Sequence, residues 1–181
     1  MGAAPAAPAL SFSSHVITAT LAVALALASP AAATTSAATL PKQGVLVPGK
    51  SLAGVRLGDT GAQVMKRWGR SYRVCTVCAR RTWMFTYRTG SPVGVAVSFR
   101  ADRVTAIFTL GAPIGWRTPQ GVAVGGDVQG IDDIYGAARW SRCIGYGALS
   151  YRVAGAVTSI YTSGEIVYGF ALMRAGEPVC Q

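Results

Sequence analysis

Residues 54–69 of this 181-residue chain align without a gap with residues 121–136, so the sequence contains an internal repeat. Glycines recur at corresponding positions, and the residues between them keep their hydrophobic character. The matching pairs are Gly54/Gly121, Val55/Val122, Gly58/Gly125, Gly69/Gly136, Leu57/Val124, Val64/Ile131 and Trp68/Tyr135. A weaker correspondence resumes between residues 87–110 and 151–172. Self-similarity of this kind indicates that one structural unit occurs twice.

Each copy begins with a pattern typical of a short helix. In the first copy, Thr60 and Gln63 have the spacing of a capping box. Val64 and Trp68 then fall on one helix face, and Gly69 suits the left-handed position that ends a helix. The corresponding residues of the second copy are Asp127 as the cap, Ile131 and Tyr135 on the inward face, and Gly136 at the end. Because helices this short need tertiary packing, we expect each to lie on a sheet.

Alternating hydrophobic residues after each helix predict two antiparallel hairpins, 93–110 and 159–172. Large side chains are expected on the face under the helix: Trp83, Phe85, Tyr87, Val95, Val97, Phe99, Val104, Phe108, Leu110, Ile166, Tyr168, Phe170 and Leu172. Small or polar ones are expected on the other: Thr86, Ala96, Ser98, Thr105, Thr109, Gly169 and Ala171. The predicted fold class is therefore α+β, with two tandem repeats, each a short helix packed on an antiparallel β-meander. Water, the other repeat or a partner could cover the small-residue face.

The motif Gly-Val-x-Leu-Gly-x-Thr, with Gly-Val-x-Val-Gly-x-Asp in the second copy, precedes a short helix that ends in aromatic-Gly and then a meander. This pattern resembles the repeat of the β-lactamase-inhibitor protein and the related BamE-type envelope proteins. The resemblance covers roughly Gly49–Leu110 and Pro119–Met173. It implies a non-catalytic fold that binds other proteins, in the inhibitor through a concave sheet surface and an acidic loop. The loop Thr89–Pro92 of this chain contains no acid, which argues against inhibition of a β-lactamase.

The first 33 residues are typical of a secretory signal peptide. A mostly apolar stretch, Val16–Leu27, is followed by Ala31 and Ala33 at the positions that a signal peptidase requires. The stretch is too short to span a bilayer comfortably. We therefore expect a secreted, extracytoplasmic protein without a transmembrane anchor after cleavage. A flexible tether is predicted over 34–48, the first repeat over 49–111 and the second over 112–181.

All 17 basic residues lie after Ala33, and fourteen of them are Arg, against seven acidic residues in total. Arg80 and Arg81 are adjacent, and Arg88 and Arg152 occupy corresponding positions in the two copies. These four arginines are the predicted binding residues. An anionic surface is a plausible partner, but no basic run with interleaved aromatic residues indicates specific nucleic-acid binding. Solubility alone is the alternative explanation of the charge.

The only histidine, His15, lies in the predicted leader. The mature chain would therefore lack imidazole for a catalytic triad, for acid–base catalysis or for the usual zinc sites. Helix starts, an exposed helix face and hairpin turns account for most of the acids. We accordingly predict no enzyme activity, no catalytic residues, no metal site and no cofactor.

Four cysteines in an exported chain suggest two disulfides. We favour Cys75 with Cys78 and Cys143 with Cys180, because each bond then staples one half and the second ties down the C-terminus. Cys75 and Cys78 also have the spacing of a redox motif, and Arg80 and Arg81 beside them could favour a thiolate.

The predicted function is that of a secreted, non-catalytic protein-binding module, either an inhibitor of an extracellular enzyme or an envelope accessory protein. Two alternatives remain open. One is a thiol-disulfide oxidoreductase that uses Cys75 and Cys78. The other is a basic protein that binds polyanions.

Overall fold

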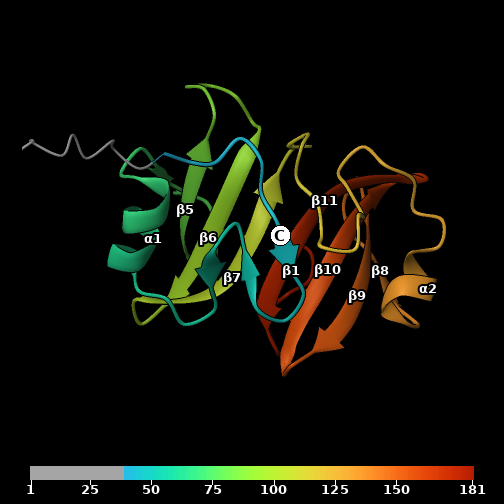
Figure 1. Ribbon diagram of the computed structural model, residues 1–181. Coiled ribbons are helices and arrows are strands. Elements are labelled where there is room, and N and C mark those ends of the chain that lie inside the picture. Colours follow the sequence, from blue (N-terminus) through green and yellow to red (C-terminus); the bar gives the residue numbers. More distant parts are fainter. Residues whose placement is uncertain (1–38) are drawn as a thin grey trace, which may run out of the picture. The chain divides into compact units, whose positions relative to one another are not determined.

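The computed structural model describes residues 39–181, which form two antiparallel sheets and two short helices (Figure 1). The small sheet contains β1 (Leu46–Val47), β2 (Ser51–Leu52) and β3 (Val55–Arg56). The large sheet contains β4 (Arg73–Val74), β5 (Arg81–Thr86), β6 (Gly94–Arg100), β7 (Arg103–Leu110), β8 (Arg139–Arg142), β9 (Gly147–Val153), β10 (Ala156–Ser163) and β11 (Ile166–Arg174). The helices are α1 (Gly61–Trp68) and α2 (Ile131–Tyr135). The predicted leader and His15 lie outside the described residues.

The large sheet has eight strands in the order β4-β5-β6-β7-β11-β10-β9-β8. Its centre is the antiparallel pairing of β7 with β11, in which Phe108 lies opposite Ala171 and Ile107 opposite Leu172. The predicted α+β class, with two tandem helix-plus-meander repeats, was therefore wrong. The described chain is mostly β, and strands from both halves share hydrogen bonds in one continuous sheet. Pairing β7 with β11 removes two exposed strand edges, which separate meanders would leave open.

The two helices differ because only the first is capped by a side chain. Thr60 and Gln63 form the predicted capping box at the start of α1. Val64 and Trp68 of this helix are buried, and the helix ends at Gly69, whose φ is 81°. The prediction for α2 was wrong at its start. Gly130 occupies the N-cap position without a side-chain hydrogen bond, and only five helical residues follow.

The predicted cap of α2, Asp127, forms a local turn instead. Its carboxylate accepts a hydrogen bond from the main-chain N–H of Gln129, two residues on, at 2.7 Å. The carboxylate is therefore used before the helix begins.

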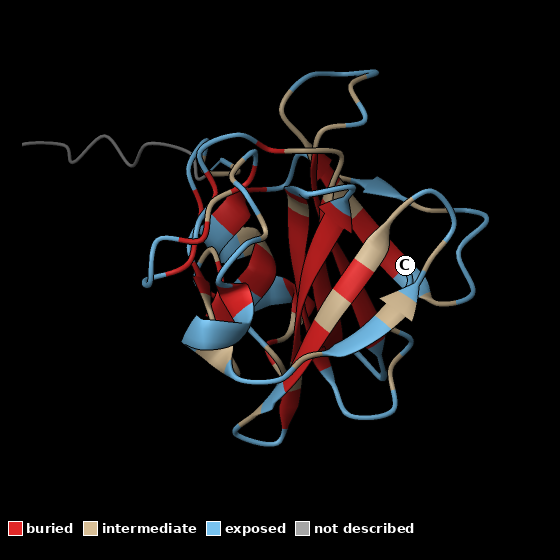
Figure 2. Cartoon of the chain, turned by 90° about the vertical axis from the view of Figure 1, so that its right-hand side faces the viewer, coloured by how far each residue is buried: buried red, intermediate tan, exposed pale blue. Residues whose placement is uncertain are grey.

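One face of the large sheet, which we call the core face, carries α1, α2 and the small sheet. Leu46 and Leu52 of the small sheet are fully buried and belong to the same hydrophobic cluster as Phe85 and Phe170 of the large sheet. The indole of Trp68 donates a hydrogen bond to the carbonyl oxygen of Ala53 at 3.0 Å. Figure 2 shows the core as buried residues along the strands, with α2 on one side of the sheet and the C-terminus on the other.

Two β-bulges change which side chains face the core. Between β6 and β7, Ser98 pairs with Ala106 and Phe99 with Val104, so Thr105 is an extra residue. The alternation therefore reverses after Val104. Ile107 joins the main core cluster, whereas Phe108 and Leu110, predicted on the core face, pack in a second cluster on the opposite face.

The second bulge lies between β10 and β11. Tyr161 pairs with Gly169 and Thr162 with Val167, so Tyr168 has no partner. Val167 is fully buried in the main cluster, whereas Ile166, predicted on the core face, is 46% exposed and Tyr168 packs against the second cluster. Period-two alternation cannot anticipate such a bulge, because the extra residue leaves no mark in the hydrophobic pattern.

Ordered structure begins earlier than residue 49, the predicted start of the first repeat. Strand β1 lies within the predicted tether, and its Leu46 N–H donates to the carbonyl oxygen of Arg117 at 2.9 Å.

Candidate functional site

The face of the large sheet opposite to the core face, here called the second face, has a floor of small side chains. They come from five adjacent strands and are largely buried: Ala96, Ser98, Ala106, Ala148, Ser150, Ser159 and Ala171. Hydroxyl pairs satisfy the serines, since Ser98 bonds to Thr82 at 2.9 Å and Ser150 to Ser159 at 2.8 Å. Such a floor lets another chain segment approach the backbone closely.

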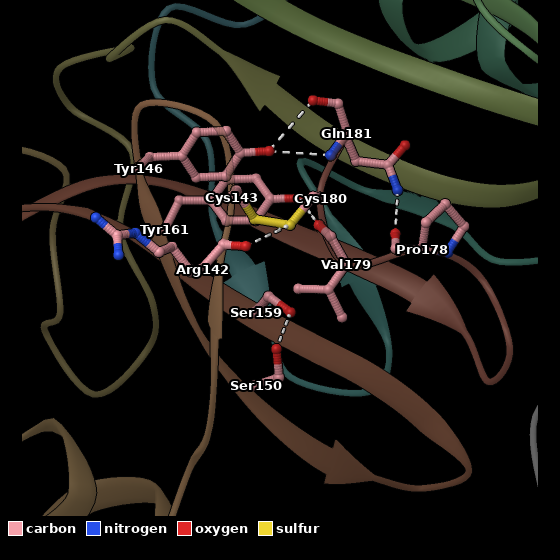
Figure 3. The surroundings of a disulfide bond; sticks show 10 residues. All are labelled: Arg142, Cys143, Tyr146, Ser150, Ser159, Tyr161, Pro178, Val179, Cys180 and Gln181. Carbon is pink, nitrogen blue, oxygen red and sulfur yellow. Dashed lines mark hydrogen bonds between the residues drawn. A yellow bond between two sulfur atoms is a disulfide. The ribbon is translucent and has the colours of Figure 1, made fainter.

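The C-terminal segment, residues 175–181, packs on this face, and Figure 3 shows its Val179, Cys180 and Gln181 beside Tyr146 and Tyr161. A disulfide joins Cys180 to Cys143, which follows β8. The Tyr161 hydroxyl, on β10, donates a hydrogen bond to the carbonyl oxygen of Val179 at 2.9 Å, and the Val179 side chain packs on the second hydrophobic cluster. The Tyr146 hydroxyl accepts a hydrogen bond from the N–H of the last residue at 2.9 Å. The chain therefore ends in a segment fixed by a covalent bond and by polar contacts.

A buried carboxylate fixes the other end of this segment. The Glu177 side chain is 6% exposed and forms ion pairs with Arg80, just before β5, and with Arg100, at the end of β6, the latter at 3.8 Å. Arg80 was predicted to bind a partner. In the structure it neutralises the protein's own glutamate.

Two clefts remain on the second face, one on each side of the C-terminal segment. The larger, about 690 Å³, lies over β8, β9 and β10. The smaller, about 330 Å³, lies over β5, β6 and β7. Glu177, Pro178 and Cys180 line both clefts. These clefts are the candidate binding site of the described chain.

The structure does not bring the four predicted arginines together. Arg152 lines the larger cleft and Arg80 the smaller one. Arg81 lies on the core face, where it pairs with Asp102 at 3.3 Å and its guanidinium carbon lies 5.0 Å from the ring centre of Trp83. Arg88 follows β5 in an exposed loop.

Arg88 lines a third cleft of about 800 Å³, on the core-face side and next to Lys42 and Ile114. The wall of this cleft includes residues 39–42, where the described chain begins. We assign it no role.

Sequence reasoning missed Arg139 and the tyrosines that hold the C-terminal segment. Arg139 lies on β8 and lines the larger cleft together with Arg152. Nothing in its sequence context distinguishes it from the other arginines. For the C-terminal segment one signal existed, namely the predicted pairing of Cys180 with Cys143.

The structure contains both predicted disulfides, Cys75–Cys78 and Cys143–Cys180. The first closes the connection between β4 and β5, where the N–H of Cys75 donates to the carbonyl oxygen of Thr82 at 2.9 Å. It does not begin a helix, as a thioredoxin-type motif does. Structural disulfides persist outside the reducing cytoplasm, so the pair is consistent with a secreted protein.

Most carboxylates of the described chain have local partners. Asp59 lies 3.6 Å from the Arg67 guanidinium and accepts the N–H of Arg56 at 2.9 Å. Asp132 accepts a hydrogen bond from the Tyr151 hydroxyl at 2.9 Å. Within residues 39–181, no three His, Cys, Asp or Glu side chains lie together in a way that could hold a metal ion. Neither helix of this part is long and apolar enough to cross a membrane.

Tyr161, which holds the C-terminal segment, makes the stability of the protein depend on pH. Burial raises the pKa of its phenol well above the usual 10.0, and the nearby Tyr146 hydroxyl adds to this effect. A folded-state pKa above that of the unfolded chain gives stability that is complete below pH 10 and is lost as the pH rises toward the folded value.

We therefore expect Tyr161→Phe to reduce the free energy of unfolding by about 1 kcal/mol at pH 8, because the hydrogen bond to Val179 is lost. Above pH 10, wild type should lose stability faster than the variant, by about 1.4 kcal/mol per pH unit. Urea titrations of both proteins at pH 8, 10 and 11 measure this difference. A gap between the two proteins that stays constant over this range would contradict the role of the buried hydroxyl.

Comparison with known proteins identifies no family. No protein-family model and no curated protein sequence matches the chain. Among solved structures, the chain is similar to an extracellular protein containing an SCP domain from Bacillus anthracis str. Ames, with 11% sequence identity and a TM-score of 0.49. The similarity covers 66% of this chain and 44% of that protein, so the chain spans less than half of the other's length.

Proposed function

We propose that the protein is a secreted, non-catalytic protein-binding module whose contact surface is the second face of the large sheet. The observation that carries this proposal is the pair of clefts that flank the C-terminal segment. Interfaces between proteins centre on apolar side chains within a polar rim. The smaller cleft offers such a centre in Met84, Phe108 and Leu110.

The rigidity of this face supports the same proposal. Strands of one continuous sheet form the floor, and a disulfide together with a buried carboxylate holds the C-terminal segment on it. A surface that is already ordered loses little conformational entropy when it binds. The engagement of most carboxylates in local contacts favours binding over catalysis.

The sequence resemblance implies the kind of partner, namely an extracellular enzyme or an envelope protein. The oxidoreductase alternative would use Cys75 and Cys78, and titration of thiols in the native exported protein separates it from the present proposal. Two low-pKa thiols that are easily reduced and reoxidised would favour the redox function.

Site-specific photocrosslinking in the organism that produces the protein tests the proposed surface. p-Benzoylphenylalanine is placed in the full-length exported chain at Val157, which lines the larger cleft, or at Leu110, which lines the smaller one. We expect crosslinks to the same partner from both positions. The matched control is Lys66, exposed on α1 on the core face.

Crosslinks from Lys66 alone, or an equal yield from all three positions, would contradict the assignment of the second face. The polyanion alternative predicts instead a steep loss of binding with salt and no discrete crosslinked protein.

A further inference from the structure

The larger cleft differs from the smaller one in charge. Arg139 and Arg152 both line it, and the side chains of both are exposed. Neither forms an ion pair with any acid among residues 39–181. The only carboxylate in the wall of the cleft is Glu177, which is buried and paired with Arg80 and Arg100. The cleft therefore presents two guanidinium groups without counter-charges.

The register of the sheet sets the distance between these two arginines. Arg139 pairs directly with Ser150, and Arg152 follows Ser150 by two residues on the same face of β9. Diagonal neighbours of this kind are about 7–8 Å apart. In an extended peptide, side chains two residues apart point the same way and are separated by about 6.6–6.8 Å. Two acidic residues in an Asp/Glu-x-Asp/Glu arrangement match this spacing.

Apart from Arg139, Arg152 and the paired Glu177, the side chains that line the cleft are uncharged. Val157 lies directly opposite Arg152 on the next strand, and Pro178 and Val179 form the wall on the side of the C-terminal segment. Ser141 and Ser150 also line the cleft, and the Ser150 hydroxyl is paired with that of Ser159. A small apolar side chain two residues after the second acid, which points the same way as the acids, would lie near Val157.

We propose that this cleft binds an extended segment of a partner protein that carries two acidic side chains two residues apart and a small apolar residue two positions after the second acid. The two carboxylates contact Arg139 and Arg152, whose planar guanidinium groups suit bidentate carboxylate contacts. This inference rests on the proposed function and adds the chemistry of the partner segment.

Binding of three acetylated and amidated peptides to the full-length oxidised protein tests the inference. The probe is Thr-Glu-Thr-Glu-Thr-Val, in which β-branched residues favour an extended chain. The first control, Thr-Gln-Thr-Gln-Thr-Val, removes the charges. The second control, Thr-Glu-Glu-Thr-Thr-Val, keeps both charges but directs the two carboxylates to opposite sides of the peptide.

We expect the protein to bind the probe more tightly than either control. Arg139→Gln and Arg152→Gln should each weaken binding of the probe about fivefold, the upper end for an exposed ion pair, and the double variant about 25-fold. Lys66→Gln, on the core face, should leave binding unchanged. Near-UV circular dichroism verifies that each variant is folded.

Equal affinity for the two peptides that contain glutamate, or equal weakening by Lys66→Gln, would show general charge attraction and overturn the inference. Absence of detectable probe binding would overturn it as well. Photocrosslinking from Val157 and Leu110 distinguishes this failure from failure of the proposed function. If the crosslinks persist in the Arg139→Gln/Arg152→Gln protein, the second face binds a partner of different chemistry.

Discussion

Replacing Cys143 and Cys180 together by serine is expected to lower the free energy of unfolding by about 4 kcal/mol, because the bond closes a long loop in the unfolded chain. The two cysteines are 37 residues apart. Denaturant titration under non-reducing conditions measures the loss. The same substitution should also free the C-terminal segment, so its main-chain amides should exchange hydrogen faster than in wild type.

The other disulfide provides the matched control. Cys75 and Cys78 are separated by three positions, and the same loop-entropy relation gives about 2 kcal/mol for their replacement by serine. Removal of this bond should leave the main-chain amides of the C-terminal segment protected from hydrogen exchange. An equal loss of stability from the two pairs, or unchanged protection in the Cys143→Ser/Cys180→Ser protein, would contradict a structural role for the second bond.

Replacing Trp68 by alanine should lower the free energy of unfolding by about 3–5 kcal/mol. Its side chain is 1% exposed, packs edge-on against Phe85 with ring centres 5.3 Å apart, and donates a hydrogen bond to the carbonyl of Ala53. Truncation leaves a cavity between α1 and the sheet and an unpaired carbonyl. Thermal and urea unfolding followed by circular dichroism measure the change.

Trp140→Ala is the control for this prediction. Trp140 lies on the edge strand β8 and is 59% exposed, so its removal should cost less than about 1 kcal/mol. If both tryptophan variants lost the same stability, α1 would not be anchored through Trp68.

Local chemistry made α1 predictable. The capping box, the inward pair Val64 and Trp68 and the terminal Gly69 depend only on residues within one stretch of chain, and the structure contains all of them. The same reasoning failed at α2, because Asp127 can accept a main-chain hydrogen bond in a turn as readily as in a helix cap. Sequence spacing does not choose between these two uses.

The failed α+β prediction has a physical reason as well. A repeated pattern describes each half of the chain but not how the halves meet. The pairing of β7 with β11 joins residues more than sixty positions apart. It is favourable because the main-chain groups at two strand edges become hydrogen-bonded. The bulge at Thr105 then decides that Ile107, and not Phe108, enters the core.

The sequence by itself determined the short helix α1 and the hairpin strands, because these features depend on neighbouring residues. It favoured the cysteine pairing that the structure contains but did not decide among the three possible pairings. Only the tertiary structure decided what covers the second face. The C-terminal segment lies there because a disulfide, a tyrosine hydroxyl and two arginines from distant strands converge on it. The pairing register of β8 with β9 places Arg139 beside Arg152 in the cleft.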